Sequence, residues 1–149
     1  MAESNEDGSV ETFRDTYAAI DRVYDMYARS CGVSPTEFWC LAAVADNGLT
    51  SQAEVADHLG ASRQTVNSAF KQLCSRGLVV LEPDPDNGRV KRARLTGDGD
   101  AFVERHLVAL DEAEKAVWEA LPAADRTMLN RVMGRYLAAL APSLASLNR

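Results

Sequence analysis

Residues 52–96 read QAEVADHLGASRQTVNSAFKQLCSRGLVVLEPDPDNGRVKRARLT, and the first half of this stretch decides the fold. Four apolar residues fall where two helices that cross near a right angle must touch, namely Val55, Leu59, Val66 and Ala69. Ala56 is small where the helices approach, Ala61 is a further matching position, and Gly60 can adopt the positive φ of the turn. We therefore predict a helix-turn-helix; the alternative is two ordinary core helices joined by a glycine turn.

The second of these helices, expected from the cap Ser62 to about residue 75, has two chemically different faces. Its inward residues are Val66, Ala69, Phe70 and Leu73, and its outward residues are Arg63, Gln64, Asn67, Ser68 and Lys71. Arg can bind guanine through two hydrogen bonds, Gln and Asn can do the same with adenine, and Ser and Lys suit phosphates. A merely solvated face is the alternative, but no acidic residue occurs in residues 62–79. The pattern favours a helix that reads DNA.

A β-hairpin should follow, with strands at residues 78–82 and 90–95 and turn-forming residues 83–88 between them. Within this loop Asn87-Gly88 is a strong hairpin signal. In a strand Arg89 and Lys91 share one face, so we expect Arg89 to enter the minor groove and Lys91 to contact phosphate. Arg92 and Arg94 lie on the other face, where we expect them to pair with acids of the long helices. The predicted DNA-binding residues are Ser51, Ser62, Arg63, Gln64, Thr65, Asn67, Ser68, Lys71, Arg89 and Lys91.

The charge distribution agrees with this assignment. Residues 60–97 contain seven basic and three acidic residues, a net charge of +4, which leaves −10 for the rest of a chain whose total is −6. Local charge is what a phosphate backbone meets, so an acidic total does not exclude DNA binding.

Long amphipathic helices flank this central lobe. We expect helices at residues 12–31, 34–45, 98–121 and from 122 onward, after an acidic arm at residues 1–11. Ser34-Pro35-Thr36-Glu37 should open the second of them as a capping box. The apolar stripes at both ends exceed what a small core can cover, so we predict a homodimer. The predicted dimer residues are Phe13, Tyr17, Ile20, Leu129, Val132, Met133, Tyr136, Leu137, Leu140 and Leu144.

The fold class is thus mainly α with a small β-hairpin wing, a winged helix-turn-helix with terminal dimerisation helices. Residues 52–80, Asp86-Asn87-Gly88-Arg89 and Leu95-Thr96-Gly97-Asp98-Gly99 resemble the MarR (multiple antibiotic resistance regulator) family, as does the opening at Ser34. The resemblance implies one domain over residues 12–149, with a DNA-binding lobe at 34–97 and dimerisation helices at 12–33 and 98–149. It also implies that Arg89 is the wing-tip arginine. Asn87 departs from the family, which usually has aspartate there to orient the arginine; Asp86 is the alternative support.

The resemblance further implies a homodimeric repressor that binds a palindromic site in double-stranded DNA and is released by a small, often aromatic ligand. Tyr24, Tyr27, Phe38 and Trp39 would lie near the ligand cleft; the alternative is that these aromatic side chains only pack the junction. A transcriptional activator, a redox-responsive regulator and a protein-interaction module without DNA binding are the open alternatives.

Other classes find little support in the residues. Cys31, Cys40 and Cys74 lack paired spacing, which indicates reduced cytoplasmic thiols, and we expect them to be buried and inert. His58, expected on the surface, and His106 are isolated, so we predict no metal site. No nucleophile–base pair or phosphate-binding glycine loop occurs, and no apolar run could span a bilayer. We therefore predict no enzyme activity, no cofactor and no membrane partner.

Overall fold

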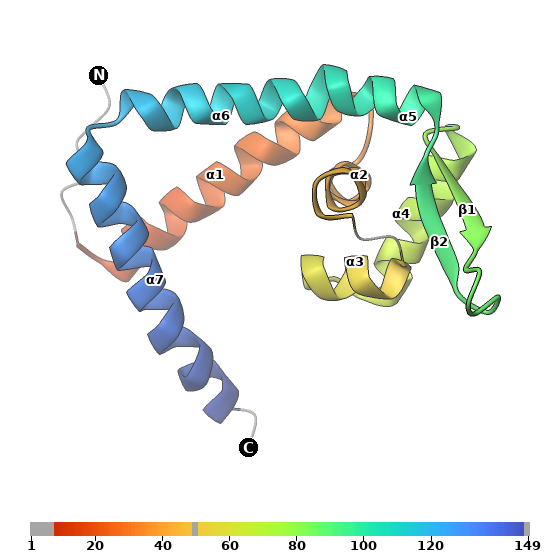
Figure 1. The fold of residues 1–149 in the computed structure, drawn as a ribbon. Helices are drawn as coiled ribbons and strands as arrows, with labels where there is room; N and C mark the ends of the chain where they lie inside the picture. The colour runs from red at the N-terminus through yellow and green to blue at the C-terminus, as the bar shows by residue number, and fades with distance from the viewer. Residues whose placement is uncertain (1–7, 49–50, 148–149) are drawn as a thin grey trace. The chain divides into compact units, whose positions relative to one another are not determined.

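The computed structural model describes residues 8–48 and 51–147, and the chain divides into two compact units, Met1–Leu107 and Val108–Arg149. The first contains the helices α1 (Val10–Ser30), α2 (Pro35–Asn47), α3 (Gln52–Leu59) and α4 (Arg63–Ser75), the antiparallel strands β1 (Val79–Pro83) and β2 (Lys91–Leu95), the helix α5 (Gly97–Phe102) and the π-helical segment η1 (Val103–Leu107). The second contains α6 (Val108–Ala120) and α7 (Ala123–Ser146). This mainly helical order with one hairpin confirms the predicted fold class (Figure 1).

The short helices begin and end at the residues that the sequence indicates. Ser34 and Ser51 each form a capping box, with Glu37 and Glu54 respectively. Gly48 and Gly60 close α2 and α3 in the left-handed conformation, with φ of 60° and 61°. A residue with a Cβ rarely adopts this conformation, so glycine ends both helices.

Several predicted boundaries differ from the structure. The first helix begins at Val10, two residues before the predicted Thr12, because Ser9 accepts a hydrogen bond from the Thr12 N–H and caps it. Part of the predicted arm, residues 8–11, therefore includes this cap and first turn, and residues 1–7 lie outside the described residues. Each strand begins one residue later than predicted, and β1 includes Pro83. The helix expected at 98–121 contains the π-helical segment η1, which no local pattern indicated.

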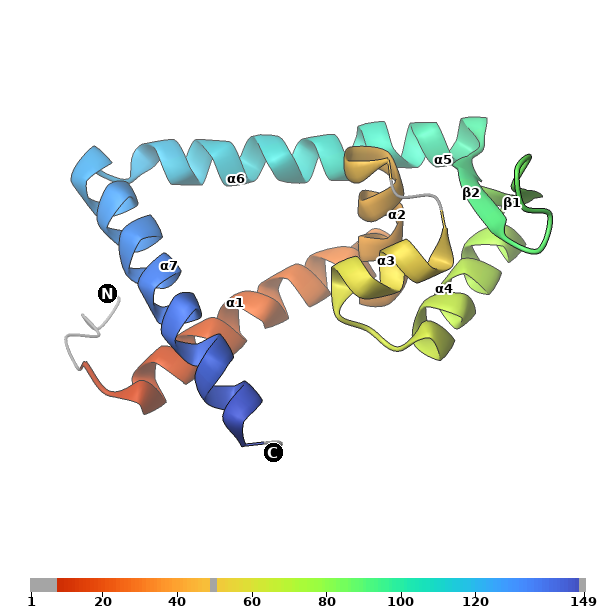
Figure 2. The same cartoon turned by 60° about the horizontal axis from the view of Figure 1, so that its bottom comes forward.

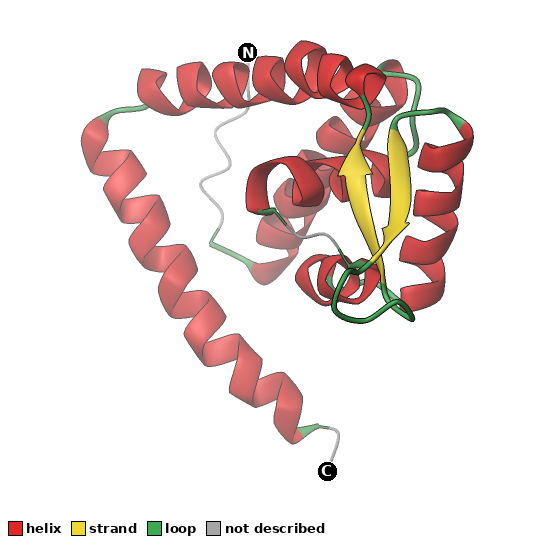
Figure 3. Cartoon of the chain, turned by 45° about the vertical axis from the view of Figure 1, so that its right-hand side comes forward, coloured by secondary structure: helices red, strands yellow, loops and turns green. Residues whose placement is uncertain are grey.

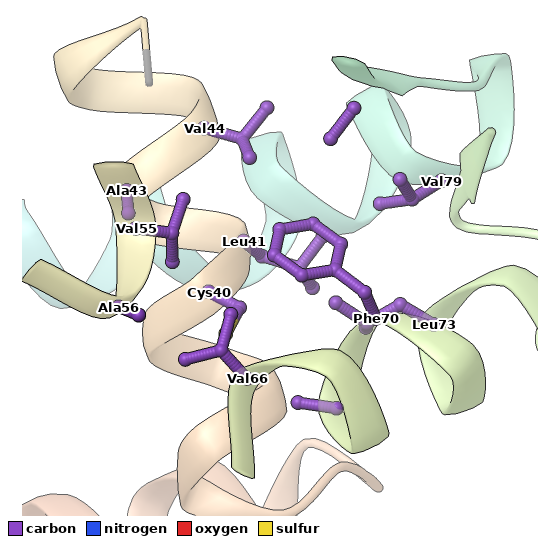
Figure 4. Packing of buried hydrophobic residues seen from close by; sticks show 12 residues of the cluster. Cys40, Leu41, Ala43, Val44, Val55, Ala56, Val66, Phe70, Leu73 and Val79 are labelled. Atoms are coloured by element: carbon purple, nitrogen blue, oxygen red, sulfur yellow. The ribbon is translucent and has the colours of Figure 1, made fainter. Parts of the chain in front are cut away.

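The core of the first unit lies where α2 meets α3 and α4. Phe70, which is 0% exposed, belongs to its apolar cluster, whereas Phe38, which is 1% exposed, packs against Tyr27 and Phe102. Figure 4 shows the ring of Phe70 within the cluster, beside Leu41 of α2. Val79 of β1 and Ala93 of β2 join the cluster, and the partly buried Leu81 and Leu95 pack against it, so each strand attaches the hairpin to the core by two apolar side chains.

A close backbone approach joins α5 to the start of the hairpin. The N–H of Thr96 donates to the Leu78 carbonyl at 3.1 Å, and the Thr96 hydroxyl donates to the Gly77 carbonyl at 2.6 Å. The same hydroxyl accepts from the Gly99 N–H at 3.0 Å and caps α5. A Cβ at Gly99 would meet the Leu78 carbonyl oxygen well inside contact distance, so this helix requires glycine there.

The second unit buries none of its described side chains. Large apolar residues of α7 are exposed by 39–66%, namely Met128, Leu129, Val132, Tyr136, Leu137 and Leu144. Within the described ranges no helix is long and apolar enough to cross a membrane.

We expect Gly99→Ala to lower the free energy of unfolding by about 1–3 kcal/mol, because its methyl group would displace the Leu78 carbonyl. Gly97→Ala is the matched control, since nothing lies within 4 Å of its Cβ, and it should stay within about 1 kcal/mol of the parent. Urea unfolding followed by circular dichroism measures both. Equal stability of the two variants would contradict the close approach.

Candidate nucleic-acid interface

One face of α4 is buried and the other is open to solvent, as its period predicts. Val66, Phe70 and Leu73 are 0% exposed and Ala69 is 6% exposed. The predicted contact residues Arg63, Gln64, Asn67, Ser68 and Lys71 are all exposed. Burial of the apolar face therefore fixes which side chains α4 presents to solvent.

Arg63, Gln64 and Asn67 line one shallow depression together with Gln52 and Ala53 of α3. Figure 2 shows α3 and α4 crossing, with a short loop between them. The structure thus brings together three of the predicted residues, and it adds two from α3. The sequence offered one clue to them, since they open the first helix of the helix-turn-helix.

Two hydroxyl groups in the predicted set, those of Ser51 and Ser62, cap helices. Ser51 Oγ accepts from the Glu54 N–H at 3.2 Å, and Ser62 Oγ accepts from the Thr65 N–H at 3.0 Å. Ser62 Oγ also shares a 2.7 Å hydrogen bond with Thr65 Oγ1. These contacts fix the N-termini of α3 and α4, where unpaired N–H groups favour anions.

The hairpin neutralises two of its four cations internally. Asp84 pairs with Arg92, and Glu82 pairs with Arg94 at 2.7 Å. The prediction that these arginines pair with acids of the long helices is wrong, because the register sets Glu82 opposite Arg92 and brings nearer acids to both. Within residues 8–48 and 51–147, Arg89 and Lys91 form no ion pair, and both are exposed. They are therefore the hairpin cations available to a ligand.

The turn signal at Asn87-Gly88 is confirmed, because the Val90 N–H donates to the Asn87 carbonyl at 2.8 Å, but this turn is only part of a longer loop. The strands end at Pro83 and Lys91, and the loop between them extends beyond the strands (Figure 3). The Asp84 N–H donates to the Val90 carbonyl at 2.8 Å and closes this loop. Asn87 Oδ1 accepts from the Arg89 backbone N–H at 3.2 Å. Asn87 therefore acts on the backbone of the wing-tip arginine.

The aromatic residues predicted near a ligand cleft contact one another instead. Tyr24 lies edge-on to Trp39 at 5.7 Å, and Tyr27 lies edge-on to Phe38 at 5.8 Å, between ring centroids. Phe38 and Trp39 are 5.4 Å apart. The Tyr27 hydroxyl donates to the His106 carbonyl at 2.8 Å. These contacts match the packing alternative, and the ligand role stays a prediction.

The cysteines differ in burial. Cys40 is fully buried, and burial together with the nearby Glu37 charge raises its pKa to about 12. Cys31 and Cys74 are only partly buried, so the expectation of three buried thiols is wrong for these two. Burial raises the pKa of Cys74, and the Lys91 charge opposes that rise. Arg76, a basic neighbour of Cys74 in sequence, pairs with Glu37 and donates to the Gly32 carbonyl.

The two histidines lie in different surroundings. His58 is exposed on α3, as predicted. The His106 ring lies tilted against Phe102, with 4.6 Å between ring centroids, and burial followed by the Arg105 charge lowers the pKa of His106. Among the described residues, no cluster of three or more His, Cys, Asp or Glu side chains could hold a metal ion.

Comparison with known proteins identifies the lobe. Residues 32–90 match the MarR family. A curated relative, the HTH-type transcriptional repressor NicR of Pseudomonas putida, is 25% identical over 116 residues, which are 78% of this chain and 73% of NicR. The winged lobe of the chain is thus similar in sequence to the MarR family, and the relatives it matches are transcription regulators. The comparisons agree with the predicted family, and the relatives are transcription regulators rather than enzymes, as the prediction of no enzyme activity requires.

Solved MarR-family structures share the fold. NMB1585, a MarR family regulator from Neisseria meningitidis, matches with a TM-score of 0.74 and 20% identity over 94% of this chain and 98% of that one. BpsR of Bordetella bronchiseptica, whose DNA binding is regulated by 6-hydroxynicotinic acid, matches with a TM-score of 0.69 and 20% identity, covering 91% and 96%. A point mutant of S. aureus MepR bound to an oligodeoxyribonucleotide matches with a TM-score of 0.54 and 21% identity, covering 86% and 94%.

We expect a disulfide reagent at pH 8 to modify Cys31 and Cys74 in the folded protein and Cys40 only after unfolding. A pKa of about 12 leaves about one Cys40 side chain in ten thousand as the reactive thiolate at that pH. Absorbance of the released thiol measures the reaction, and the double variant Cys31→Ser/Cys74→Ser isolates Cys40. Rapid labelling of Cys40 in that folded variant would contradict its burial.

Proposed function

We propose that this chain is a homodimeric repressor that reads a palindromic DNA site with α4 and the hairpin and releases it on binding a small ligand. The observation that carries the proposal is the depression lined by Arg63, Gln64 and Asn67 beside the N-terminus of α3. The donors and acceptors of this set match the base edges in a major groove.

In this proposal α4 enters the major groove with its N-terminal turn foremost. Arg63 would bind guanine through O6 and N7, and Gln64 and Asn67 would bind adenine through N6 and N7. Ser68 and Lys71 lie further along the exposed face and would contact phosphate. The capped N-termini at Ser51 and Ser62 would direct N–H groups at the phosphate backbone.

The hairpin would follow the adjacent minor groove. Arg89 is exposed at the tip and belongs to no ion pair within the described part of the chain. Its guanidinium would enter the narrow groove, where the potential is most negative, and Lys91 would contact phosphate. MepR bound to an oligodeoxyribonucleotide provides a precedent of the same fold.

A second copy of the chain would cover the apolar surfaces of the terminal helices. On α7 the stripe of Leu129, Val132, Tyr136, Leu137 and Leu144 is 39–66% exposed, and on α1 Tyr17 and Ile20 are 53% and 50% exposed. Phe13, Met133 and Leu140 of the predicted dimer set are partly buried. Exposed apolar area of this extent is typical of an interface rather than of a monomer surface. Two copies would present two α4 helices to two half-sites.

Ligand control is the part of the proposal that rests most on relatives. Regulation of BpsR by 6-hydroxynicotinic acid indicates an aromatic ligand. The cluster of Tyr24, Tyr27, Phe38 and Trp39 joins α1 to α2, which carries α3 and α4 on its other side. A ligand that separated these rings would shift α2 and hence α4, because packed interiors transmit such movements.

We expect Arg63→Ala to weaken binding by about 1–3 kcal/mol and to relax preference at one base pair. Arg89→Ala should weaken binding to selected and random duplexes alike and reduce its salt dependence. Fluorescence anisotropy on an operator selected from random duplexes by the parent protein measures both effects.

Arg22→Ala is the matched control for these two variants, since it removes the same charge from an exposed position on α1. Failure of the parent to select any duplex would refute the DNA-binding proposal. If Arg63→Ala bound as the parent does, the assignment of α4 as reading helix would be wrong.

We expect Leu137→Asp to convert the dimer to a monomer, because it places a carboxylate within the apolar stripe of α7, where Leu137 is 66% exposed. Ala138→Asp introduces the same group outside that stripe and should leave the dimer intact. Light scattering after gel filtration gives the mass of each. A monomeric parent at micromolar concentration would exclude the dimer proposal.

A further inference from the structure

The tip of the hairpin contains a buried carboxylate within an exposed loop. The Asp84 side chain is 5% exposed, while residues 85–89 are all exposed. An ionised carboxylate is rarely buried unless charged or N–H groups surround it. The loop is therefore folded around this side chain.

The contacts of Asp84 reach the start, middle and end of the loop. Its Oδ1 accepts from the Asp86 N–H at 2.7 Å and from the Asn87 N–H at 2.9 Å. Its Oδ2 pairs with Arg92 of β2, and its own N–H donates to the Val90 carbonyl. One residue thus holds both the backbone of the tip and the returning strand.

These contacts continue to the wing-tip arginine. Asn87, held by Asp84, accepts the Arg89 N–H through Oδ1 and the Val90 N–H through its carbonyl. Arg92, the partner of Asp84, also forms a β-bridge with Ser51 at the N-terminus of α3. Asp84 therefore connects the backbone of Arg89 with the segment that begins α3.

The second paired acid of the hairpin lacks this arrangement. Glu82 is 54% exposed and, within the described part of the chain, accepts hydrogen bonds only from Arg94. Both acids neutralise one arginine, but Asp84 alone also binds the backbone of the loop. Glu82 therefore contributes only its charge, whereas Asp84 also determines the shape of the loop.

We propose that Asp84 is the positioning residue of the wing, which orders the tip so that Arg89 is presented to DNA in its binding geometry. The proposal rests on the proposed function, because it assumes that the wing contacts DNA. A loop that is already ordered before binding loses little conformational entropy when it binds. The smaller entropy cost strengthens the affinity.

The protonation state of Asp84 supports this role. The Arg92 side chain, and after it the Asp86 N–H, holds the pKa of the Asp84 carboxyl below its usual range. The carboxylate is thus ionised at neutral pH, and its contribution to wing order is lost only as the pH falls below about 4.

The experiment compares Asp84→Ala with Glu82→Ala, since each removes one acid and its ion pair with one arginine of β2. On the operator selected by the parent, Asp84→Ala should bind about threefold to tenfold more weakly than Glu82→Ala. This fold-change corresponds to the entropy cost of ordering one or two additional residues when the protein binds DNA. In an Arg89→Ala background the difference between the two should disappear, because positioning acts through that arginine. Equal affinities, or a difference that persists without Arg89, would overturn the proposal.

Two further measurements keep the test decisive. Asp84→Asn retains an oxygen for the two loop N–H groups, so its DNA affinity should fall between those of the parent and Asp84→Ala. If Asp84→Ala fails to fold, Asp84→Asn must still bind DNA more weakly than Glu82→Gln. Backbone ¹⁵N relaxation without DNA should show greater mobility of residues 86–89 in the Asp84 variants alone. Unchanged mobility would refute the positioning role even where DNA binds, whereas a parent that selects no duplex would refute the proposed function instead.

Discussion

The burial of one face of α4 against α2 and α3 is the constraint on which the rest of the lobe depends. Val66, Phe70 and Leu73 are fully excluded from water, which fixes the rotation of the helix about its own axis. Arg63, Gln64 and Asn67 must then face outward. The surface chemistry of this helix is therefore a consequence of its core packing, and it needs no additional contact to orient it.

The hairpin follows a different principle, because it has almost no core of its own. Val79 and Ala93, with the partly buried Leu81 and Leu95, attach it to the apolar cluster, and its tip depends on charged and backbone contacts. Asp84 and Glu82 each engage an arginine within the hairpin. Half of the hairpin cations thus maintain its shape, and the other half, Arg89 and Lys91, remain open to solvent.

The second unit differs from the central lobe because its apolar residues are exposed. Its helices have apolar residues at helical spacing, yet none of the described ones is buried. The hydrophobic effect makes such a surface unfavourable in water, at roughly 25 cal/mol for each Å² of apolar area left exposed. A second copy of the chain would relieve this cost, and it would also pair two reading helices. Stability and DNA recognition would then depend on the same association.

The sequence by itself determined the elements whose residues act locally. Serine caps, glycine ends and a 3.6-residue apolar period are sufficient to place α2, α3 and α4, and the period also indicates which side of α4 is polar. Only the tertiary structure decided the partners of Arg92 and Arg94, the form of the wing loop and the addition of Gln52 and Ala53 to the depression on α4. These features depend on strand register and on a carboxylate that gathers N–H groups from its own loop. Asn87-Gly88 is a strong local turn signal and does form a turn, but the wider loop around it is shaped by the contacts of Asp84, which satisfy a buried charge.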